Sequence, residues 1–429
     1  MNAICVVIDG WHAGYAGCYG NSWIATPEVD RLACEGFVFD QAVSDSLSLE
    51  RLYRGYWQGE SALAPDADGE RLTLPCELKA AGIQTALVTD EPRVAELALA
   101  GEFDEVHRVS AEPRRRTAAD ITETHLALPF AEAADWLAAA RRPFLLWIHA
   151  RGMTAPWDAP LSLRNQYADD PDRLPPDFAD VPCRLLPQGF DPDELLGIRW
   201  TYAGQASLLD QCLGGLIESI ELAKLAEETL LVVISARGFA LGEHGRVGLP
   251  VESGDRIAGA SSPSLCEEII HVPWLIRLPG NAPAAGRSQA LVQPADLCLT
   301  LLDYWKLPAD VARGGKSLWP IVREEVSAVR DRVCIERELA GEGTVERAIR
   351  TSLWLLRWQA TCGPAEAVAY TQEPAAAPEL FVKPDDRWEV NDVADRCADL
   401  IEPLKRAFDD HAQYVRGQLA DLPPLDPAM

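Results

Sequence analysis

The most constraining feature of this chain is an apolar, β-branched run at residues 232–234 that ends in a turn of small residues. The run continues as Ser235-Ala236-Arg237-Gly238, and a Gly- and His-containing segment follows at residues 241–245. Such a run is typical of a strand that is buried on both faces of a parallel sheet. The carboxyl ends of these strands line the crevice where ligands bind. The sequence therefore predicts that residues 236–245 reach a ligand crevice.

The length and the periodicity of the chain predict two domains. A chain of 429 residues exceeds the size of one ordinary core. Up to residue 335, short apolar segments alternate with helical patterns, which favours a largely parallel sheet with helices on both faces. The pattern then changes to paired strands and an amphipathic helix. We therefore expect an α/β domain over residues 1–335 and a smaller α+β domain, an antiparallel sheet with a helix, over residues 336–429.

The individual elements can be assigned from their patterns. The first helix is the clearest, because Thr26 is a good cap residue and Pro27 suits the first helical position. In the first domain we expect strands at residues 4–9, 85–90, 144–149, 230–235 and 272–278, and helices at 27–35, 74–81, 129–140, 195–220 and 294–302. In the second we expect a strand pair or one long strand at residues 347–358 and an amphipathic helix at 398–418.

The composition excludes several classes of partner. The net charge of −27 disfavours nucleic acid, because phosphate recognition needs a basic surface. No apolar run approaches the ~18 residues needed to cross a bilayer, so no membrane partner is expected. Residues 1–9 resemble a first core strand and not a signal peptide. Eleven Cys without CxxC spacing fit buried free thiols. We therefore expect an acidic, cytoplasmic protein.

Segments along nearly the whole chain resemble, in order, the sulfatase branch of the alkaline phosphatase superfamily. Residues 9–20 are similar to the family's opening motif, and residues 26–42 to its first helix and the following strand. The strand and loop at residues 232–245 are similar to the segment that reads Ser-Asp-His-Gly and then Leu-Gly-Glu-His-Gly in the family. Residues 267–277 and 379–394 resemble later segments. The resemblance implies an α/β fold, a large mixed, mostly parallel sheet between helices with a smaller C-terminal α+β subdomain, and a scaffold for sulfuric ester hydrolysis.

The resemblance also shows which metal ligands have been replaced. The family surrounds a divalent cation, Ca²⁺ or a similar ion, with carboxylates from the first strand and with Asp and His or Asn from the strand at residues 230–235. Of the matching positions, only Asp9 keeps a carboxylate, since Gly10, Ala236 and Arg237 offer none. Such ions prefer about 6–8 oxygen ligands. We therefore expect no metal site and no cofactor.

The family's nucleophile is missing as well. In the family it is a Cys or Ser in Cys-x-Pro-x-Arg that is converted to formylglycine, and counting back from Gly59 places this position at Leu49. Ser48 could replace it if the alignment shifts by one residue, with Arg51 nearby. A serine without a neighbouring base or metal is a poor nucleophile, however. A cap or turn role for Ser48 is the simpler interpretation.

Three further positions belong to the expected crevice. His149 ends a predicted strand and either faces the crevice or is a hydrogen-bonded core histidine. Thr154 stands where the family has a His that meets the sulfate, and His244 lies in a loop that matches the family and is mainly architectural. The expected pocket lining is Asp9, Gly10, Leu49, Thr154, Ala236, Arg237 and His244.

Arg237 suggests what takes the place of the cation. If Asp9 and Arg237 keep the family's strand ends, both point into one crevice. A buried carboxylate without its cation is costly, whereas a guanidinium can meet it with two hydrogen bonds. We therefore consider an Asp9–Arg237 ion pair. The alternative is that Arg237 turns to solvent and Asp9 caps the following helix.

These observations leave three functions open. The first is a catalytically silent pseudoenzyme that binds a small anion, a sulfated or phosphorylated ligand, or a protein partner. The second is an active sulfate- or phosphate-ester hydrolase with a rearranged site that uses Ser48, Arg51 and His149. The third is a structural subunit that pairs with an active homologue. The lost ligands and nucleophile favour the first.

Overall fold

The chain folds into two compact units that are each built from separated segments. The computed structural model describes residues 1–65, 72–168, 173–250, 264–281, 285–309, 314–339, 343–361 and 377–429. Unit 1 comprises Met1–Asp40, Leu72–Leu249 and His271–Ser288, and unit 2 comprises Gln41–Arg71, Pro250–Ile270 and Gln289–Met429. The predicted domain boundary at residue 335 stays a prediction.

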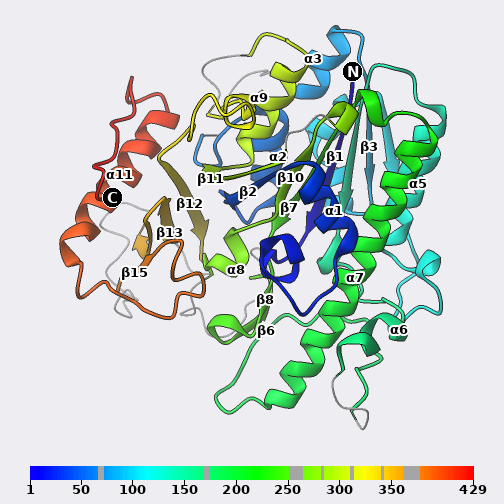
Figure 1. The fold of residues 1–429 in the computed structure, drawn as a ribbon. Helices are drawn as coiled ribbons and strands as arrows, with labels where there is room; N and C mark the ends of the chain where they lie inside the picture. The colour runs from blue at the N-terminus through cyan, green and yellow to red at the C-terminus, as the bar shows by residue number, and fades with distance from the viewer. Residues whose placement is uncertain are drawn as a thin grey trace. The chain divides into compact units, whose positions relative to one another are not determined.

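The largest sheet has eight strands in the order β11-β2-β10-β7-β1-β5-β3-β4 (Figure 1). The central pairs β7–β1, β1–β5, β5–β3 and β3–β4 are parallel, and β10 is antiparallel to both β7 and β2. The prediction of a mixed, mostly parallel sheet is therefore confirmed, and all five predicted strands are present. Their bounds are β1 (Asn2–Asp9), β2 (Phe37–Ala42), β3 (Gln84–Thr89), β4 (Glu105–Arg108), β5 (Phe144–Ala150), β7 (Thr229–Arg237), β10 (Trp274–Arg277) and β11 (Gly286–Val292).

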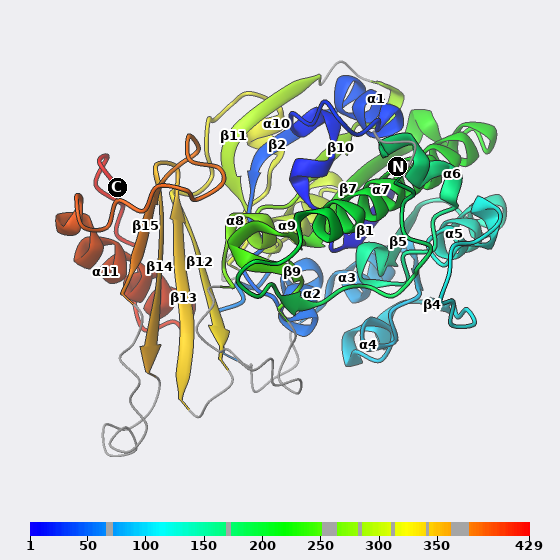
Figure 2. The same ribbon diagram turned by 90° about the horizontal axis from the view of Figure 1, so that it is seen from below.

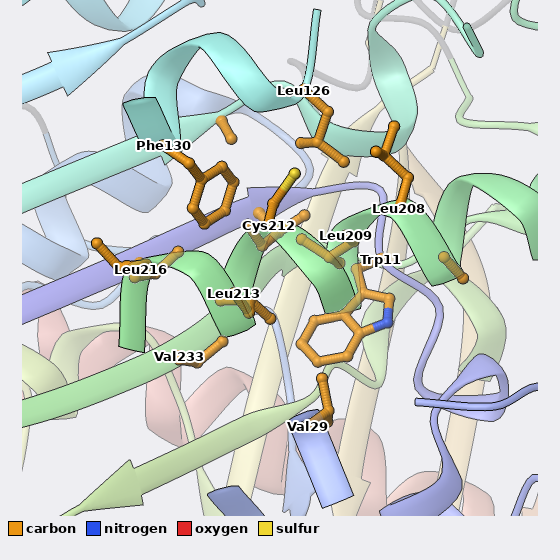
Figure 3. Close-up of a cluster of buried hydrophobic side chains, with 14 of the residues drawn as sticks. Trp11, Val29, Leu126, Phe130, Leu208, Leu209, Cys212, Leu213, Leu216 and Val233 are labelled. Carbon is orange, nitrogen blue, oxygen red and sulfur yellow. The ribbon is translucent and has the colours of Figure 1, made fainter. Parts of the chain in front are cut away.

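Three helices of unit 1, α1 (Pro27–Glu35), α5 (Ala127–Ala139) and α7 (Pro192–Leu222), cover one face of the central strands. Figure 3 shows side chains of α7, among them Leu213, packed between Phe130 of α5 and Val233 of β7. Burying each such side chain stabilises the fold by about 1.5–3 kcal/mol. This packing holds β1 and β7 rigidly in place.

The shorter elements of unit 1 connect these parts. They are α3 (Leu74–Ala80), α4 (Pro92–Ala95), α6 (Leu161–Arg164) and a small sheet in the order β6-β9-β8 with strands Arg184–Leu185, Arg246–Gly248 and Ala240–Leu241. Among the described residues, no helix of either unit combines the length and apolar character needed to span a bilayer. Every cysteine in the described ranges is free; Cys34 and Cys183 are exposed, so the prediction of buried thiols does not hold for all of them.

Unit 2 contains the predicted antiparallel sheet. Its order is β12-β13-β14-β15, and α11 packs on it through Leu404 and Phe408, whose ring lies 5.2 Å from that of Trp358 (Figure 2). The elements of unit 2 are α2 (Leu49–Gln58), α8 (Glu267–Ile270), α9 (Ala295–Tyr304), α10 (Trp319–Val322), β12 (Arg332–Glu338), β13 (Thr344–Thr351), β14 (Trp354–Thr361), β15 (Glu379–Val382) and α11 (Ala398–Val415).

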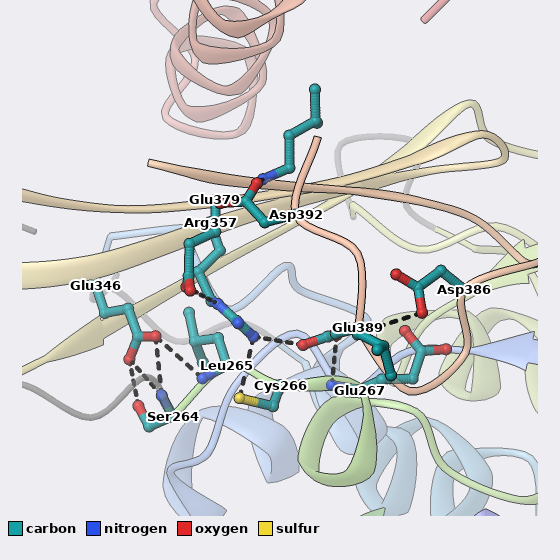
Figure 4. Close-up of polar contacts among 12 residues, drawn as sticks. Ser264, Leu265, Cys266, Glu267, Glu346, Arg357, Glu379, Asp386, Glu389 and Asp392 are labelled. Atoms are coloured by element: carbon teal, nitrogen blue, oxygen red, sulfur yellow. Dashed lines mark hydrogen bonds and ion pairs between the residues drawn. The ribbon is translucent and has the colours of Figure 1, made fainter. Parts of the chain in front are cut away.

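A buried charge network joins this sheet to neighbouring loops of unit 2 (Figure 4). The Nη1 of Arg357 donates to Glu389 at 2.6 Å and its Nε to Glu379 at 2.8 Å. Glu346 accepts bonds from the backbone amides of Ser264 and Leu265. Because buried charges are tolerated only when they are paired, this network fixes the loops at one register on the sheet.

Candidate functional site

The candidate site lies where parallel strands of unit 1 end. Asp9 is the last residue of β1 and lies opposite Arg237, the last residue of β7, after a bulge that shifts the register between Ile8 and Asp9. Val7 is paired with His149 near the end of β5, and His149 in turn with Thr89 at the end of β3. Because the carboxyl ends of parallel strands share one edge of a sheet, these residues gather at the edge where ligands usually bind.

Asp9 and Arg237 form a buried ion pair with two contact points. The Nε of Arg237 donates to Oδ1 of Asp9 at 2.9 Å, and Nη2 donates to Oδ2 at 2.5 Å. Asp9 is 0% exposed and Arg237 is 4% exposed. Burial by itself would raise the pKa of Asp9, but the charge and the hydrogen bonds of Arg237 outweigh it and the pKa is lowered. Arg237 therefore pairs with Asp9 and does not turn to solvent.

The residue after Asp9 has a backbone conformation that favours glycine. Gly10 has φ +76°, and a Cβ at this position would lie 3.1 Å from Thr154 and 3.3 Å from Phe239. The hydroxyl of Tyr202 donates to the carbonyl of Gly10 at 2.7 Å and accepts from the amide of His12 at 2.9 Å. A larger side chain at residue 10 would therefore be strained in this conformation.

Two further residues hold the end of β1. The Oγ of Ser235 accepts from the amide of Trp11 at 3.1 Å and lies 2.8 Å from the carbonyl oxygen of Ile8. Gly152 approaches so closely that a Cβ on it would lie 2.8 Å from the carbonyl oxygen of Asp9. Sequence analysis did not single out Ser235 or Gly152 as supports of the site. Close backbone approaches of this kind leave little signal in a single sequence.

Thr154 is an uncharged neighbour of Asp9. The Oγ1 of Thr154 lies 3.4 Å from Oδ2 of Asp9 and donates to the carbonyl of Arg151 at 2.9 Å. Ala236 is fully buried. The rings of Trp157, Tyr202 and Phe239 are buried and pack with centroids 5.4 to 5.5 Å apart. The neighbourhood of the ion pair is thus filled with packed side chains.

His149 is a neutral, fully buried base next to this pair. Burial lowers its pKa to about 4, and the positive charges of Arg237 and Arg93 act in the same direction. The carboxylates of Asp9 and Glu91 oppose the shift without reversing it. At neutral pH the imidazole therefore carries no charge. Full burial places this imidazole in the interior of unit 1.

The turn between β3 and α4 adds a group of charged residues that the sequence did not reveal. Asp90 accepts from the amide of Arg151 at 2.8 Å, and burial raises its pKa to about 6. Glu91 lies 3.2 Å from Arg93 and 3.6 Å from Arg151. The only available signal was the charged sequence that directly follows the predicted strand at residues 85–90.

Ser48, Leu49 and Arg51 belong to unit 2, whereas the ion pair belongs to unit 1. Leu49 is buried and begins α2, and Ser48 directly precedes it at the cap position. Among the described residues, the Ser48 hydroxyl has no hydrogen-bond partner, and it makes no cap bond. Arg51 is exposed and donates to the carbonyl of Ala62 at 2.7 Å. Within unit 2, Ser48 thus has no base in hydrogen-bond contact.

His244 lies in a short helical turn that follows β8 in unit 1. The turn spans Glu243–Gly245, and His244 is half-buried there with φ +50°. A left-handed conformation at a non-glycine residue is uncommon and indicates a constrained loop. This placement is compatible with the architectural role expected for the loop.

The donor set at the strand ends does not fit a hard divalent cation. Both carboxylate oxygens of Asp9 are bound by Arg237, and the guanidinium repels a metal ion. Gly10 and Ala236 have no side-chain oxygen. A site that prefers several carboxylate and carbonyl oxygens is therefore not present around Asp9.

Comparisons with known proteins agree with this fold. A family model described as Sulfatase matches residues 1–307. An N-acetylglucosamine-6-O-sulfatase of Bacteroides thetaiotaomicron is 23% identical over 76% of this chain and 71% of its own. The crystal structure of a phosphonate monoester hydrolase of Agrobacterium radiobacter has a TM-score of 0.73 at 16% identity and covers 98% of this chain and 97% of its own. A 2-O GAG sulfatase has a TM-score of 0.70 at 14% identity, with 100% and 95% coverage.

Removing one partner of the ion pair should destabilise the folded protein much more than removing both. Arg237→Met leaves the Asp9 carboxylate buried without its partner, so we expect a loss of about 3–5 kcal/mol of unfolding free energy. Adding Asp9→Asn should restore part of that loss. The measurement is a double-mutant cycle by denaturant unfolding. Strictly additive effects, or a loss below about 1 kcal/mol for Arg237→Met, would contradict the pairing.

The buried His149 should make the protein less stable in mild acid. The unfolded chain binds a proton near pH 6.5, whereas folded His149 does so only near pH 4. Stability contributed by the neutral imidazole is therefore lost as the pH falls through this window. Between pH 7 and pH 5, the free energy of unfolding of His149→Gln should fall by about 2 kcal/mol less than that of the wild type. The free energy of unfolding is measured in urea. If wild type and variant lose equal amounts between pH 7 and pH 5, His149 is not shielded from protonation.

Proposed function

This chain belongs to the sulfatase family, and we propose that it is a catalytically silent member that binds a small anion in place of hydrolysing an ester. The observation that carries the proposal is the two-point Asp9–Arg237 ion pair, with contacts of 2.9 and 2.5 Å. It engages the one carboxylate kept at the family's metal-ligand positions. It also engages the guanidinium that could otherwise stabilise a reacting anion.

Each group that ester hydrolysis requires is replaced, lacks an activating partner or is bound to another residue. A hydroxyl nucleophile needs a base or a metal to activate it, and among the described residues the Ser48 hydroxyl has no hydrogen-bond partner. Leu49, which matches the family nucleophile by sequence, has a buried hydrocarbon side chain. Developing negative charge needs donors that are free to meet it, and Arg237 is bound to Asp9. These features support a scaffold without hydrolytic chemistry.

The best anion-binding groups at the same strand edge are Arg93 and Arg151. Their side chains are 52% and 37% exposed, and both pair with one carboxylate, that of Glu91. The planar guanidinium fork suits the oxygens of sulfate or phosphate. A sulfated or phosphorylated ligand would therefore bind at this edge through electrostatics and hydrogen bonds.

Hydrolysis should be absent with the substrates that active relatives suggest. We expect no turnover above background of 4-nitrophenyl sulfate, 4-nitrophenyl phosphate or a phenylphosphonate monoester, with or without added Ca²⁺. The reason is the missing nucleophile and the engaged guanidinium. Turnover that Ser48→Ala abolishes would contradict the proposal and favour a rearranged hydrolase. Stable co-purification with a larger active homologue would favour a structural subunit.

Sulfate should stabilise the folded protein through Arg93 and Arg151. At about 10 mM sulfate we expect a small rise in the midpoint of thermal unfolding, because an anion that binds only the folded state shifts the equilibrium towards it. The double variant Arg93→Gln/Arg151→Gln should lose the response. Chloride at matched ionic strength is the control. An equal response of wild type and variant would exclude these arginines as the anion site.

A further inference from the structure

A cavity of about 460 Å³ lies in unit 1 between the segment at residues 173–184 and the first turns of α7. None of its lining residues belongs to the Asp9–Arg237 site. Ile198 and Trp200 of α7 are buried and form its base, together with the half-buried Phe178. Leu174 lines it as well and is 78% exposed. The cavity thus has an aromatic and aliphatic interior and is of a size that suits a small ligand.

The cavity lining contains one more carboxylate than it has guanidinium groups. Arg173 pairs with Asp193 at 2.5 Å, and Arg184 pairs with Glu194. Asp180 lines the same cavity, is exposed, and forms no ion pair or hydrogen bond with any residue that the structure describes. Both guanidiniums are therefore matched by an acid, and the local surplus is negative.

We propose that this cavity binds an organic amine, a primary ammonium group that carries an aromatic or aliphatic substituent. The ammonium would meet Asp180, and the substituent would pack on Phe178, Ile198 and Trp200. Trp and Phe faces attract cations as well as apolar groups, by roughly 0.5–2 kcal/mol. The net charge of −27 raises the local concentration of cations and disfavours anionic ligands of similar shape.

Other ligand classes fit the lining less well. An organic anion would face the unpaired Asp180 and two guanidiniums that already have partners. A neutral apolar molecule would gain the interior contacts but not the carboxylate. The proposal therefore depends on one charge and one apolar surface acting together. It is independent of whether the chain hydrolyses esters.

The test is calorimetric titration of the full chain with phenethylamine, with phenylacetate and benzyl alcohol as the anionic and neutral analogues. We expect phenethylamine to bind saturably and to bind at least about tenfold more tightly than phenylacetate, as a charge contact of about 1.4 kcal/mol would give. Asp180→Asn should weaken phenethylamine binding about two- to fivefold, because the ammonium loses its charged partner at an exposed position. Glu96→Gln, at an exposed acid of unit 1 outside the cavity lining, is the matched control and should change nothing.

Leu174→Ala separates the apolar contribution from the charge. It should weaken phenethylamine binding about threefold, because an exposed side chain that covers the ligand is shortened. Absence of saturable phenethylamine binding would overturn the proposal. Equal affinities for phenethylamine and phenylacetate, or wild-type affinity in Asp180→Asn, would overturn it as well. Because no ester is involved, these outcomes do not depend on the assays for hydrolysis.

Discussion

The structure at the sheet edge depends on one requirement: a carboxylate at the end of a buried parallel strand needs a positive partner. Asp9 is 0% exposed and points into an interior where an unpaired charge would cost several kcal/mol. Arg237 supplies the partner from the adjacent strand, opposite Asp9 after a shift of register between Ile8 and Asp9. A guanidinium provides charge and two directed hydrogen bonds at once, so no further ligand is needed to satisfy Asp9.

The scaffold around this pair holds it in place. Gly10 and Gly152 allow the backbone to pass close to neighbouring side chains, and Ser235 and Tyr202 bind the free backbone groups of the turn. The helices on one face of the sheet fix the strands from which Asp9 and Arg237 project. These contacts hold the two strand ends in place around the ion pair.

Most of the fold could be predicted from the sequence, because apolar runs and helix caps locate the strands and helices within a few residues. The Asp9–Arg237 pair was also accessible, since both residues end neighbouring strands and carry opposite charges. The group around Asp90 and Glu91 was not, because a short turn after a strand has no periodicity to read. A single sequence does not show which distant segments pack together, so the composition of unit 2 from three separate segments could not be read from it.

The central claim is that Arg237 takes the place of a cation beside Asp9. Equilibrium dialysis of the purified protein against labelled Ca²⁺, with Arg237→Asn as the comparison, tests it most directly. The account predicts no stoichiometric Ca²⁺ in the wild type at millimolar free ion, because both oxygens of Asp9 are engaged. One tightly held Ca²⁺ per wild-type chain, lost on Asp9→Asn, would contradict it.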